Sequence, residues 1–152
     1  MAPGDAEREA FELAVAAITR KERTAAELHD LLLGRGVEPD AVAATLDRLA
    51  EIGELDDRRF ALAYAADKRE LRGWGPDRIR GTLIERGVAP ALAEEAAGGE
   101  DHATQAERAA ALLAARGEDL ADDGSRGRAL AYLARRGFDY EVAYEAIRRA
   151  AA

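Results

Sequence analysis

The side chains able to carry out acid–base or metal chemistry are few in this 152-residue chain, and their spacing does not suit a catalytic site. The two histidines, His29 and His102, are far apart in sequence, and there is no cysteine to supply a thiolate. Asp56 and Asp57 are adjacent, so on a helix they do not face each other as two catalytic carboxylates do. We therefore predict no catalytic residue, no metal site and no enzymatic activity.

A nucleotide cofactor is not expected either. Gly73-Trp74-Gly75 has the form GxG, but no strand pattern precedes it and the rest of a phosphate-binding loop is missing. We predict no cofactor-binding residue, and the chemistry that remains is binding.

Tryptophan and arginine are the residue types with the strongest binding potential here. Trp74 is the single tryptophan and lies between two glycines, close to Arg72 and Arg78. An exposed indole beside guanidinium groups could anchor a protein interface, in which Trp and Arg are enriched, or stack on a nucleobase. The structural alternative is that the ring fills the junction between two neighbouring units of the fold.

The basic side chains gather in two stretches, residues 68–86 and residues 126–136, and the second contains no acidic residue. The alternative to a binding role is that these arginines are solvated on helix surfaces or favoured by the negative C-terminal end of a helix. The candidate partner-binding residues are Arg69, Arg72, Trp74, Arg78, Arg80, Arg126, Arg128, Arg135 and Arg136.

The overall charge of −8 argues against strong, indiscriminate binding of nucleic acid, which depends on neutralising phosphates. Residues 1–55 carry 6 basic and 12 acidic side chains (6 − 12 = −6), whereas residues 56–100 and 101–152 each carry 8 and 9 (8 − 9 = −1). We expect bare single-stranded DNA to be bound weakly, through the two basic stretches.

The elements that must position these residues form a repeat. Arg-Gly-(Val/Phe) occurs with its glycine at Gly36, Gly87 and Gly137, spaced by 51 and then 50 residues. A repeat of this length that cannot bury its own apolar face must stack on its neighbours. We predict an all-α fold of three tandem three-helix repeats, at residues 1–54, 55–100 and 101–152, which form an elongated, curved helical array.

Local signals place the helices. Thr24 and Glu27 form a capping box, Gly36 can take the left-handed conformation that ends a helix, and Pro39, Pro76 and Pro90 suit first helical turns. No segment shows the period-two alternation of a strand.

Other expectations concern helix faces and loops. Phe11, Val15 and Ile18 have the i, i+4, i+7 spacing of one inward face, and Leu71 belongs to the apolar pattern of the helix that starts near Asp56. The stretch from Gly117 to Gly127 is rich in Gly, Asp and Ser and is predicted to be a loop.

The second unit carries a longer signature. It consists of Leu55-Asp56-Asp57-Arg58-Arg59-Phe60-Ala61, Tyr64, Arg72-Gly73-Trp74-Gly75-Pro76-Asp77-Arg78-Ile79 and Arg86-Gly87-Val88. These segments closely resemble the RecX family of recombination regulators. In the first unit, three shorter segments resemble the first repeat of that family: Arg23-Thr24, Glu27-Leu28 and Arg35-Gly36. The resemblance covers nearly the whole chain. The third unit departs from it, because Asp123-Gly124-Ser125-Arg126-Gly127 stands where a counterpart of Gly-Trp-Gly-Pro would be.

The resemblance implies tandem three-helix repeats and a function. It implies a regulator, mainly an inhibitor, that binds the RecA–single-stranded-DNA filament and restrains ATP hydrolysis, strand exchange and co-protease activity. The alternatives are a sequence-tolerant nucleic-acid-binding helical module and a general helical adaptor.

The remaining expectations concern location and assembly. No apolar run reaches the roughly 18 residues of a membrane span, and the N-terminal residues lack the pattern of a secretory signal. We expect a monomer in the bacterial cytoplasm, without membrane contact.

Overall fold

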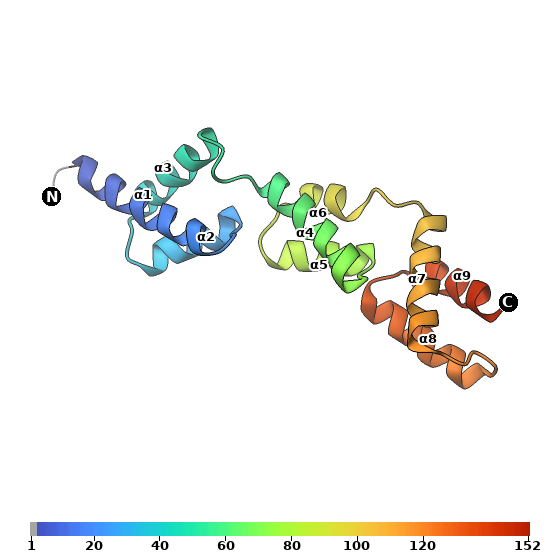
Figure 1. Ribbon diagram of the computed structural model, residues 1–152. Coiled ribbons are helices and arrows are strands. Elements are labelled where there is room, and N and C mark those ends of the chain that lie inside the picture. Colours follow the sequence, from blue (N-terminus) through green and yellow to red (C-terminus); the bar gives the residue numbers. More distant parts are fainter. Residues whose placement is uncertain (1–2) are drawn as a thin grey trace.

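The computed structural model describes residues 3–152, which form nine α-helices and no strand (Figure 1). The helices follow one another in three groups along an elongated, gently bent body, with the two ends of the chain far apart. They are α1 Pro3–Arg20, α2 Ala25–Gly34, α3 Pro39–Glu51, α4 Asp57–Arg72, α5 Pro76–Glu85, α6 Pro90–Ala97, α7 His102–Arg116, α8 Asp123–Arg136 and α9 Tyr140–Ala151.

Each group of three helices packs around its own small core, so the all-α array of three-helix repeats is confirmed. Leu28, Leu32 and Leu49 are fully buried in the first group, and Ile79 and Leu83 in the second. In the third group the buried cluster contains Leu113, Leu133, Phe138 and Ile147. Alanines fill much of the remaining space, which lets these short helices approach closely. The unit boundaries after residues 54 and 100 remain a proposal.

Helix starts and stops follow the predicted chemistry. The Thr24 hydroxyl accepts a hydrogen bond from the Glu27 N–H, and the Glu27 carboxylate accepts one from the Thr24 N–H, so the capping box is confirmed. Pro39, Pro76 and Pro90 each begin a helix. Gly36 follows α2 with φ of 83°, a conformation that glycine adopts at little cost.

The inward face of α1 differs from the prediction. Ala10, Ala14 and Ala17 are buried, whereas Val15 is 36% exposed. Phe11 and Ile18 pack only at the edge of this core. The predicted face was wrong because it gave weight to large side chains, and here the close contact with α3 needs small ones.

The predicted loop at residues 117–127 was also wrong in its second half. Asp122 caps α8: its carboxylate accepts from the Ser125 N–H, and the Ser125 hydroxyl accepts from the Asp122 N–H. This cap starts the helix at Asp123 despite Gly124 and Gly127 in its first turns. Leu71 does not face the core, since it is 75% exposed near the end of α4.

Candidate protein and nucleic-acid interface

The connection between α4 and α5 is held by its two glycines. α4 ends at Gly73, whose φ of 66° reverses the chain, and Gly75 is the N-cap of α5. A Cβ atom at Gly75 would lie 2.5 Å from the carbonyl carbon of Gly137, at the end of α8. Gly75 is therefore the point at which the second unit meets the third.

Backbone hydrogen bonds close this contact. The Gly75 N–H donates to the Arg136 carbonyl oxygen at 2.7 Å, and the Asp77 N–H donates to that of Gly137 at 2.9 Å. A Cβ atom at Gly137 would lie 2.4 Å from the Cβ atom of Arg78. The Arg-Gly motif of the third unit is thus the surface that docks on the second unit.

Trp74 lies in this connection but its ring belongs to the second unit. The indole packs against the core cluster around Ile79 and Leu83 and is half-buried. Arg78 covers it, with the guanidinium carbon 4.0 Å from the ring centroid, and the Lys68 ammonium lies 5.1 Å from the centroid. The backbone carbonyl of Trp74 accepts a hydrogen bond from Arg108 of the third unit. The indole is therefore partly exposed, and the side chains of Arg78 and Lys68 lie over its ring.

The aromatic and cationic contacts continue along α4. Phe60, Tyr64 and Lys68 are spaced by four residues and share one helix face. The ring centroids of Phe60 and Tyr64 are 5.9 Å apart, and those of Tyr64 and Trp74 are 6.3 Å apart. We call Phe60, Tyr64, Trp74, Lys68, Arg78 and Arg86 the aromatic ladder. Partial burial raises the pKa of Tyr64, which keeps its ring neutral between these cations.

Arg86 ends the ladder at the junction with the first unit. Its guanidinium carbon lies 4.7 Å from the Phe60 ring centroid, and its side chain forms two hydrogen bonds with the Glu27 carboxylate. Burial opposes ionisation of Glu27, but the hydrogen bonds from Arg86 and the Thr24 N–H outweigh it and hold the pKa of Glu27 below its ordinary value. The hydrogen bond to Glu27 raises the pKa of Arg86. The ladder thus runs from one junction to the other.

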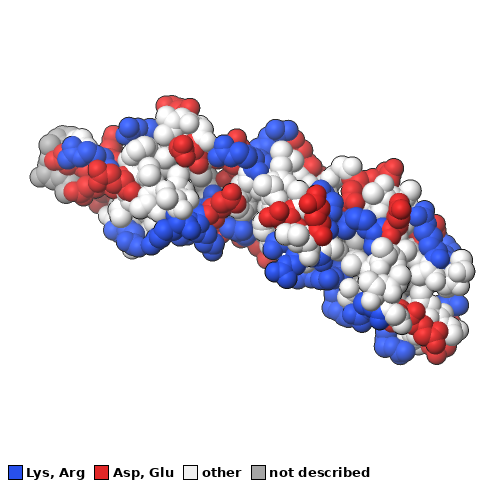
Figure 2. Space-filling view, viewed as in Figure 1, with Lys and Arg blue, Asp and Glu red and all other residues white. Residues whose placement is uncertain are grey.

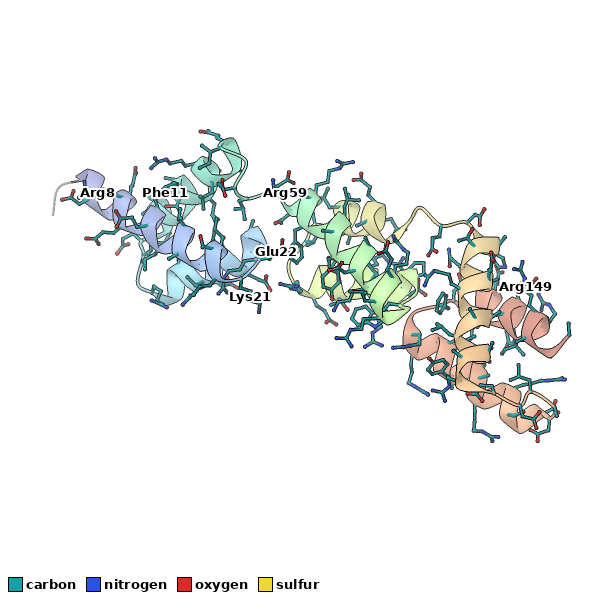
Figure 3. The ribbon with its side chains drawn as sticks, in the orientation of Figure 1. Arg8, Phe11, Lys21, Glu22, Arg59 and Arg149 are labelled. Carbon is teal, nitrogen blue, oxygen red and sulfur yellow. The ribbon has the colours of Figure 1, made fainter. Side chains whose placement is uncertain are left out.

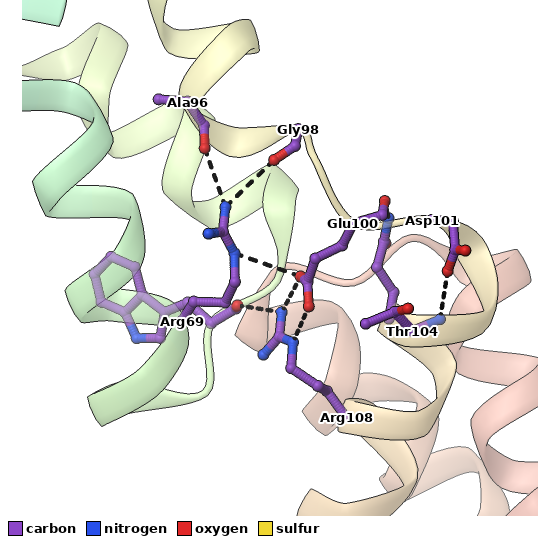
Figure 4. Close-up of polar contacts among 9 residues, drawn as sticks. Arg69, Ala96, Gly98, Glu100, Asp101, Thr104 and Arg108 are labelled. Carbon is purple, nitrogen blue, oxygen red and sulfur yellow. Dashed lines mark hydrogen bonds and ion pairs between the residues drawn. The ribbon is translucent and has the colours of Figure 1, made fainter.

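Arg69 is turned inward rather than toward a partner. Its guanidinium donates to the Ala96 carbonyl and lies 3.4 Å from the Glu100 carboxylate, which also binds Arg108 at 2.6 Å (Figure 4). The Glu100 side chain is only 12% exposed. Arg69 therefore helps to fix α4, α6 and α7 relative to one another, and we leave it out of the proposed surface. The sequence prediction missed Glu100 and Arg108.

The other predicted arginines fall into three sets. Arg72, Arg128 and Arg135 are exposed, and their side chains have no hydrogen bond or ion pair within residues 3–152. Arg80 is paired with Asp77 and Glu94. Arg126 donates to the Leu120 carbonyl, and Arg136 lies over the Tyr132 ring.

The structure brings part of the two basic stretches together. Arg78 donates to the Arg135 carbonyl at 3.4 Å, so the end of α8 adjoins the start of α5 next to Trp74. We call Arg72, Trp74, Arg78, Arg135 and Arg136 the junction surface. Arg126 is ten positions from Arg136 along α8, about 15 Å at 1.5 Å per residue, and lies apart from it. Basic side chains are prominent along one edge of the array, toward the bottom of Figure 2.

No group of three His, Cys, Asp or Glu side chains suited to a metal ion occurs within residues 3–152. Over the same residues, no helix is long and apolar enough to cross a membrane.

Comparison with known proteins agrees with this architecture. Residues 10–49 match the family described as RecX, first three-helix domain, and residues 56–96 match RecX, second three-helix domain. The crystal structure of RecX from Lactobacillus salivarius superposes with a TM-score of 0.87 at 19% identity, covering 97% of both chains. At that identity the likeness shows the fold.

Sequence relatives are closer. The regulatory protein RecX of Mycobacterium avium is 34% identical over 145 residues, covering 93% of this chain and 84% of that protein. That of Xanthomonas axonopodis pv. citri is 40% identical over 129 residues, covering 83% and 78%. With both repeat domains matched and relatives similar over most of their length, the chain belongs to the RecX family.

Proposed function

We propose that this protein regulates the RecA recombinase by binding the RecA–single-stranded-DNA filament, and that it acts mainly as an inhibitor. It uses shape and charge and carries out no chemistry of its own. Family membership gives the general role, because the relatives are named regulatory proteins. The junction surface is the observation that carries the proposal for this chain, since it brings a partly exposed indole covered by Arg78 together with the unpaired arginines Arg72 and Arg135 at one connection.

The elongated array suits a helical filament as a partner. A body of three linked units can contact successive subunits at the same time, where a compact domain of the same size would contact one. The second and third units are joined by backbone hydrogen bonds and by the buried Arg69–Glu100–Arg108 group. A bound array held in this way opposes the subunit movements that ATP turnover and strand exchange require, and the same occupancy restrains co-protease activity.

Charge favours the filament over bare DNA. The chain carries −8 overall, which repels phosphates, whereas Arg72 and Arg135 present unpaired positive charge locally. Each phosphate contact adds close to one unit to the salt dependence of binding, so a few contacts give weak and salt-sensitive affinity. DNA is then contacted weakly or through RecA, in the cytoplasm, by a monomer.

The experiment measures RecA ATP hydrolysis on single-stranded DNA with and without the protein, together with co-sedimentation against DNA alone at physiological salt. We expect turnover to fall, co-sedimentation to require RecA, and the protein alone to hydrolyse no ATP. Unchanged turnover at stoichiometric protein would contradict the proposal.

A second candidate is a sequence-tolerant nucleic-acid-binding module. The indole of Trp74 covered by Arg78 favours it, because aromatic and guanidinium planes stack on bases. Tight, salt-resistant binding to single-stranded DNA without RecA would support this alternative.

A further inference from the structure

An apolar groove lies between α8 and α9, apart from the junction surface. It encloses about 660 Å³ and is lined by the apolar side chains of Leu130, Tyr144 and Ile147, with Arg126 and Arg148 among its other lining residues. Tyr144 is 50% exposed, and Tyr140, one turn earlier, is 62% exposed with its ring centroid 6.4 Å from that of Tyr144. Exposed tyrosines beside arginines are typical of the central contacts in protein interfaces.

The repeat shows that this groove is specific to the third unit. When the units are aligned on their Arg-Gly glycines, Leu130 and Tyr144 of the third unit correspond to Arg80 and Glu94 of the second. Those two side chains form an ion pair of 3.5 Å across the same helix pair. The equivalent residues of the first unit are His29 and Ala43. At these two positions the third unit therefore carries an aliphatic and an aromatic side chain, a pair that neither of the other units has.

The charge around the groove selects the partner. At the groove, the first half of α8 carries Arg126 and Arg128 against Asp123 (2 − 1 = +1), whereas Arg135 and Arg136 lie at its other end. Arg126 uses one nitrogen for the Leu120 carbonyl and has no carboxylate partner within residues 3–152. Arg148 is 69% exposed, although it pairs with Glu145 on its own helix. Two guanidinium groups, of which that of Arg126 has no carboxylate partner within residues 3–152, therefore border an apolar floor.

We propose that the groove between α8 and α9 binds an acidic amphipathic helix of a partner protein. The apolar face of that helix would cover Leu130, Tyr144 and Ile147, as in other helix-in-groove complexes, and its carboxylates would pair with Arg126 and Arg148. A nucleic acid fits less well, because an apolar floor offers nothing to phosphates. The inference does not depend on the proposed function, since it concerns a surface that the junction surface does not include.

The test uses the full chain and a labelled synthetic helical peptide with leucines along one face and glutamates beside them. Fluorescence anisotropy at moderate salt measures its affinity, and the same peptide with lysines in place of glutamates is the charge control. We expect the glutamate peptide to bind at least about tenfold more tightly than the lysine peptide.

The decisive variant is Leu130→Arg combined with Tyr144→Glu, which installs the ion pair of the second unit in the third. The second unit folds with that pair, so helicity and melting should be retained while peptide affinity falls about tenfold or more. Leu62→Arg, which changes a leucine that is 40% exposed on α4, is the matched control and should bind the peptide normally.

Three results would overturn the inference. The first is that both peptides bind equally or that the double variant binds the glutamate peptide as the parent does. The second is that sedimentation shows a concentration-dependent dimer of the parent protein but not of the double variant. That result would mean that a second copy of this chain occupies the groove. The third is loss of single-stranded DNA binding in the double variant. RecA inhibition that persists in the double variant leaves the proposed function intact.

Discussion

The two junctions of the array join equivalent helices with different chemistry. At the first junction, the Thr24 hydroxyl donates to the Arg86 carbonyl at 2.7 Å, and the Asp57 carboxylate accepts from the Ala25 N–H at 2.9 Å. At the second, backbone N–H groups of Gly75 and Asp77 take the place of these side chains. The arginine carbonyl of the following unit is thus bound by a side-chain hydroxyl at the first junction and by a backbone N–H at the second, where Arg78 and Arg108 add side-chain hydrogen bonds.

The packing differs accordingly. A polar hollow of about 470 Å³ borders the first junction, and Glu22 and Arg59 lie on its two sides (Figure 3). The second junction has glycine against glycine, and Leu112 lies against Gly73. A Cβ atom at Gly87 would also lie 2.3 Å from that of Ala26, so both junctions are sensitive to side-chain volume. We infer that the first junction is in addition sensitive to pH and salt, through the ion pair between Arg86 and Glu27. The following predictions test that difference.

Gly137→Ala should have the largest effect. The new Cβ atom would meet Arg78 at 2.4 Å, in a backbone with φ of 100°. We expect the free energy of unfolding to fall by at least about 3 kcal/mol, from steric clash and backbone strain together. Small-angle scattering should show a larger radius of gyration, and RecA inhibition should decrease.

Gly36→Ala is the matched control. Gly36 has φ of 83°, but nothing lies within 4 Å of its Cβ position. The substitution should lower the free energy of unfolding only by the strain of a left-handed alanine, about 1–2 kcal/mol. Equal losses in the two variants would mean that the contact with the neighbouring unit adds nothing to the cost at Gly137.

Trp74→Ala should have a smaller effect, because the ring packs on the second unit's core and is already half-buried. We expect a loss of about 2–3 kcal/mol, below the range for a fully buried tryptophan. Scattering should show the array unchanged in length, since the ring packs on the second unit's core and the Trp74 carbonyl that accepts from Arg108 is retained. Urea unfolding gives the stability, and the ATPase assay shows whether inhibition drops with folding intact. A lengthened or flexible array would mean that the ring does fill the junction.

Glu27→Gln tests the pH sensitivity of the first junction. The pKa of Glu27 is lowered in the folded protein, so its contribution is present above the ordinary glutamate pKa of about 4.3 and is lost as pH falls through the lower folded value. We expect a loss of about 1 kcal/mol at pH 7, reduced by partial solvent exposure, that shrinks toward zero in acid.

Urea unfolding at a series of pH values makes this measurement. Glu12→Gln, at an exposed position on α1, is the control and should not change the pH dependence. A deficit for Glu27→Gln that is the same at every pH would contradict an ionic first junction.

Arg72→Glu should change stability least, within about 0.5 kcal/mol, because the side chain is exposed and unpaired. It should nevertheless weaken RecA inhibition by reversing charge on the junction surface. Arg35→Glu makes the same change at the end of α2, where no unit docks, and should inhibit normally. If both variants inhibit like the parent, the site lies elsewhere, and Arg126 and Arg128 become the next candidates.

The sequence predicted the parts of the fold that local chemistry determines. The Arg-Gly spacing, the Thr24 capping box and the three prolines at helix starts are each readable from a few neighbouring residues. The buried face of α1 could not be predicted in this way. Alanines contribute little to a hydrophobic pattern, although they determine how closely helices pack. The helix start at the Asp122 cap was missed because Gly124 and Gly127, which follow it, are typical of a loop.

The site was less predictable than the fold. The three arginine-glycine motifs look alike in sequence. A Cβ atom added at Gly87 would nevertheless clash with Ala26, and one added at Gly137 with Arg78, whereas one added at Gly36 would meet nothing. That difference depends on contacts between units 50 residues apart. The aromatic ladder had a detectable signal in the four-residue spacing of Phe60, Tyr64 and Lys68, but the inward turn of Arg69 toward Glu100 had none.

The cap of α8 differs in chemistry from the equivalent residues of the other two units. Thr24 and Gly75 each offer a hydrogen-bond donor to the arginine carbonyl of the following unit. At the equivalent place Asp122 presents a carboxylate, which has only acceptors and repels a carbonyl oxygen. The side-chain donor that Thr24 supplies thus has no counterpart at Asp122. A surface that approaches this end of α8 is therefore favoured if it brings hydrogen-bond donors of its own.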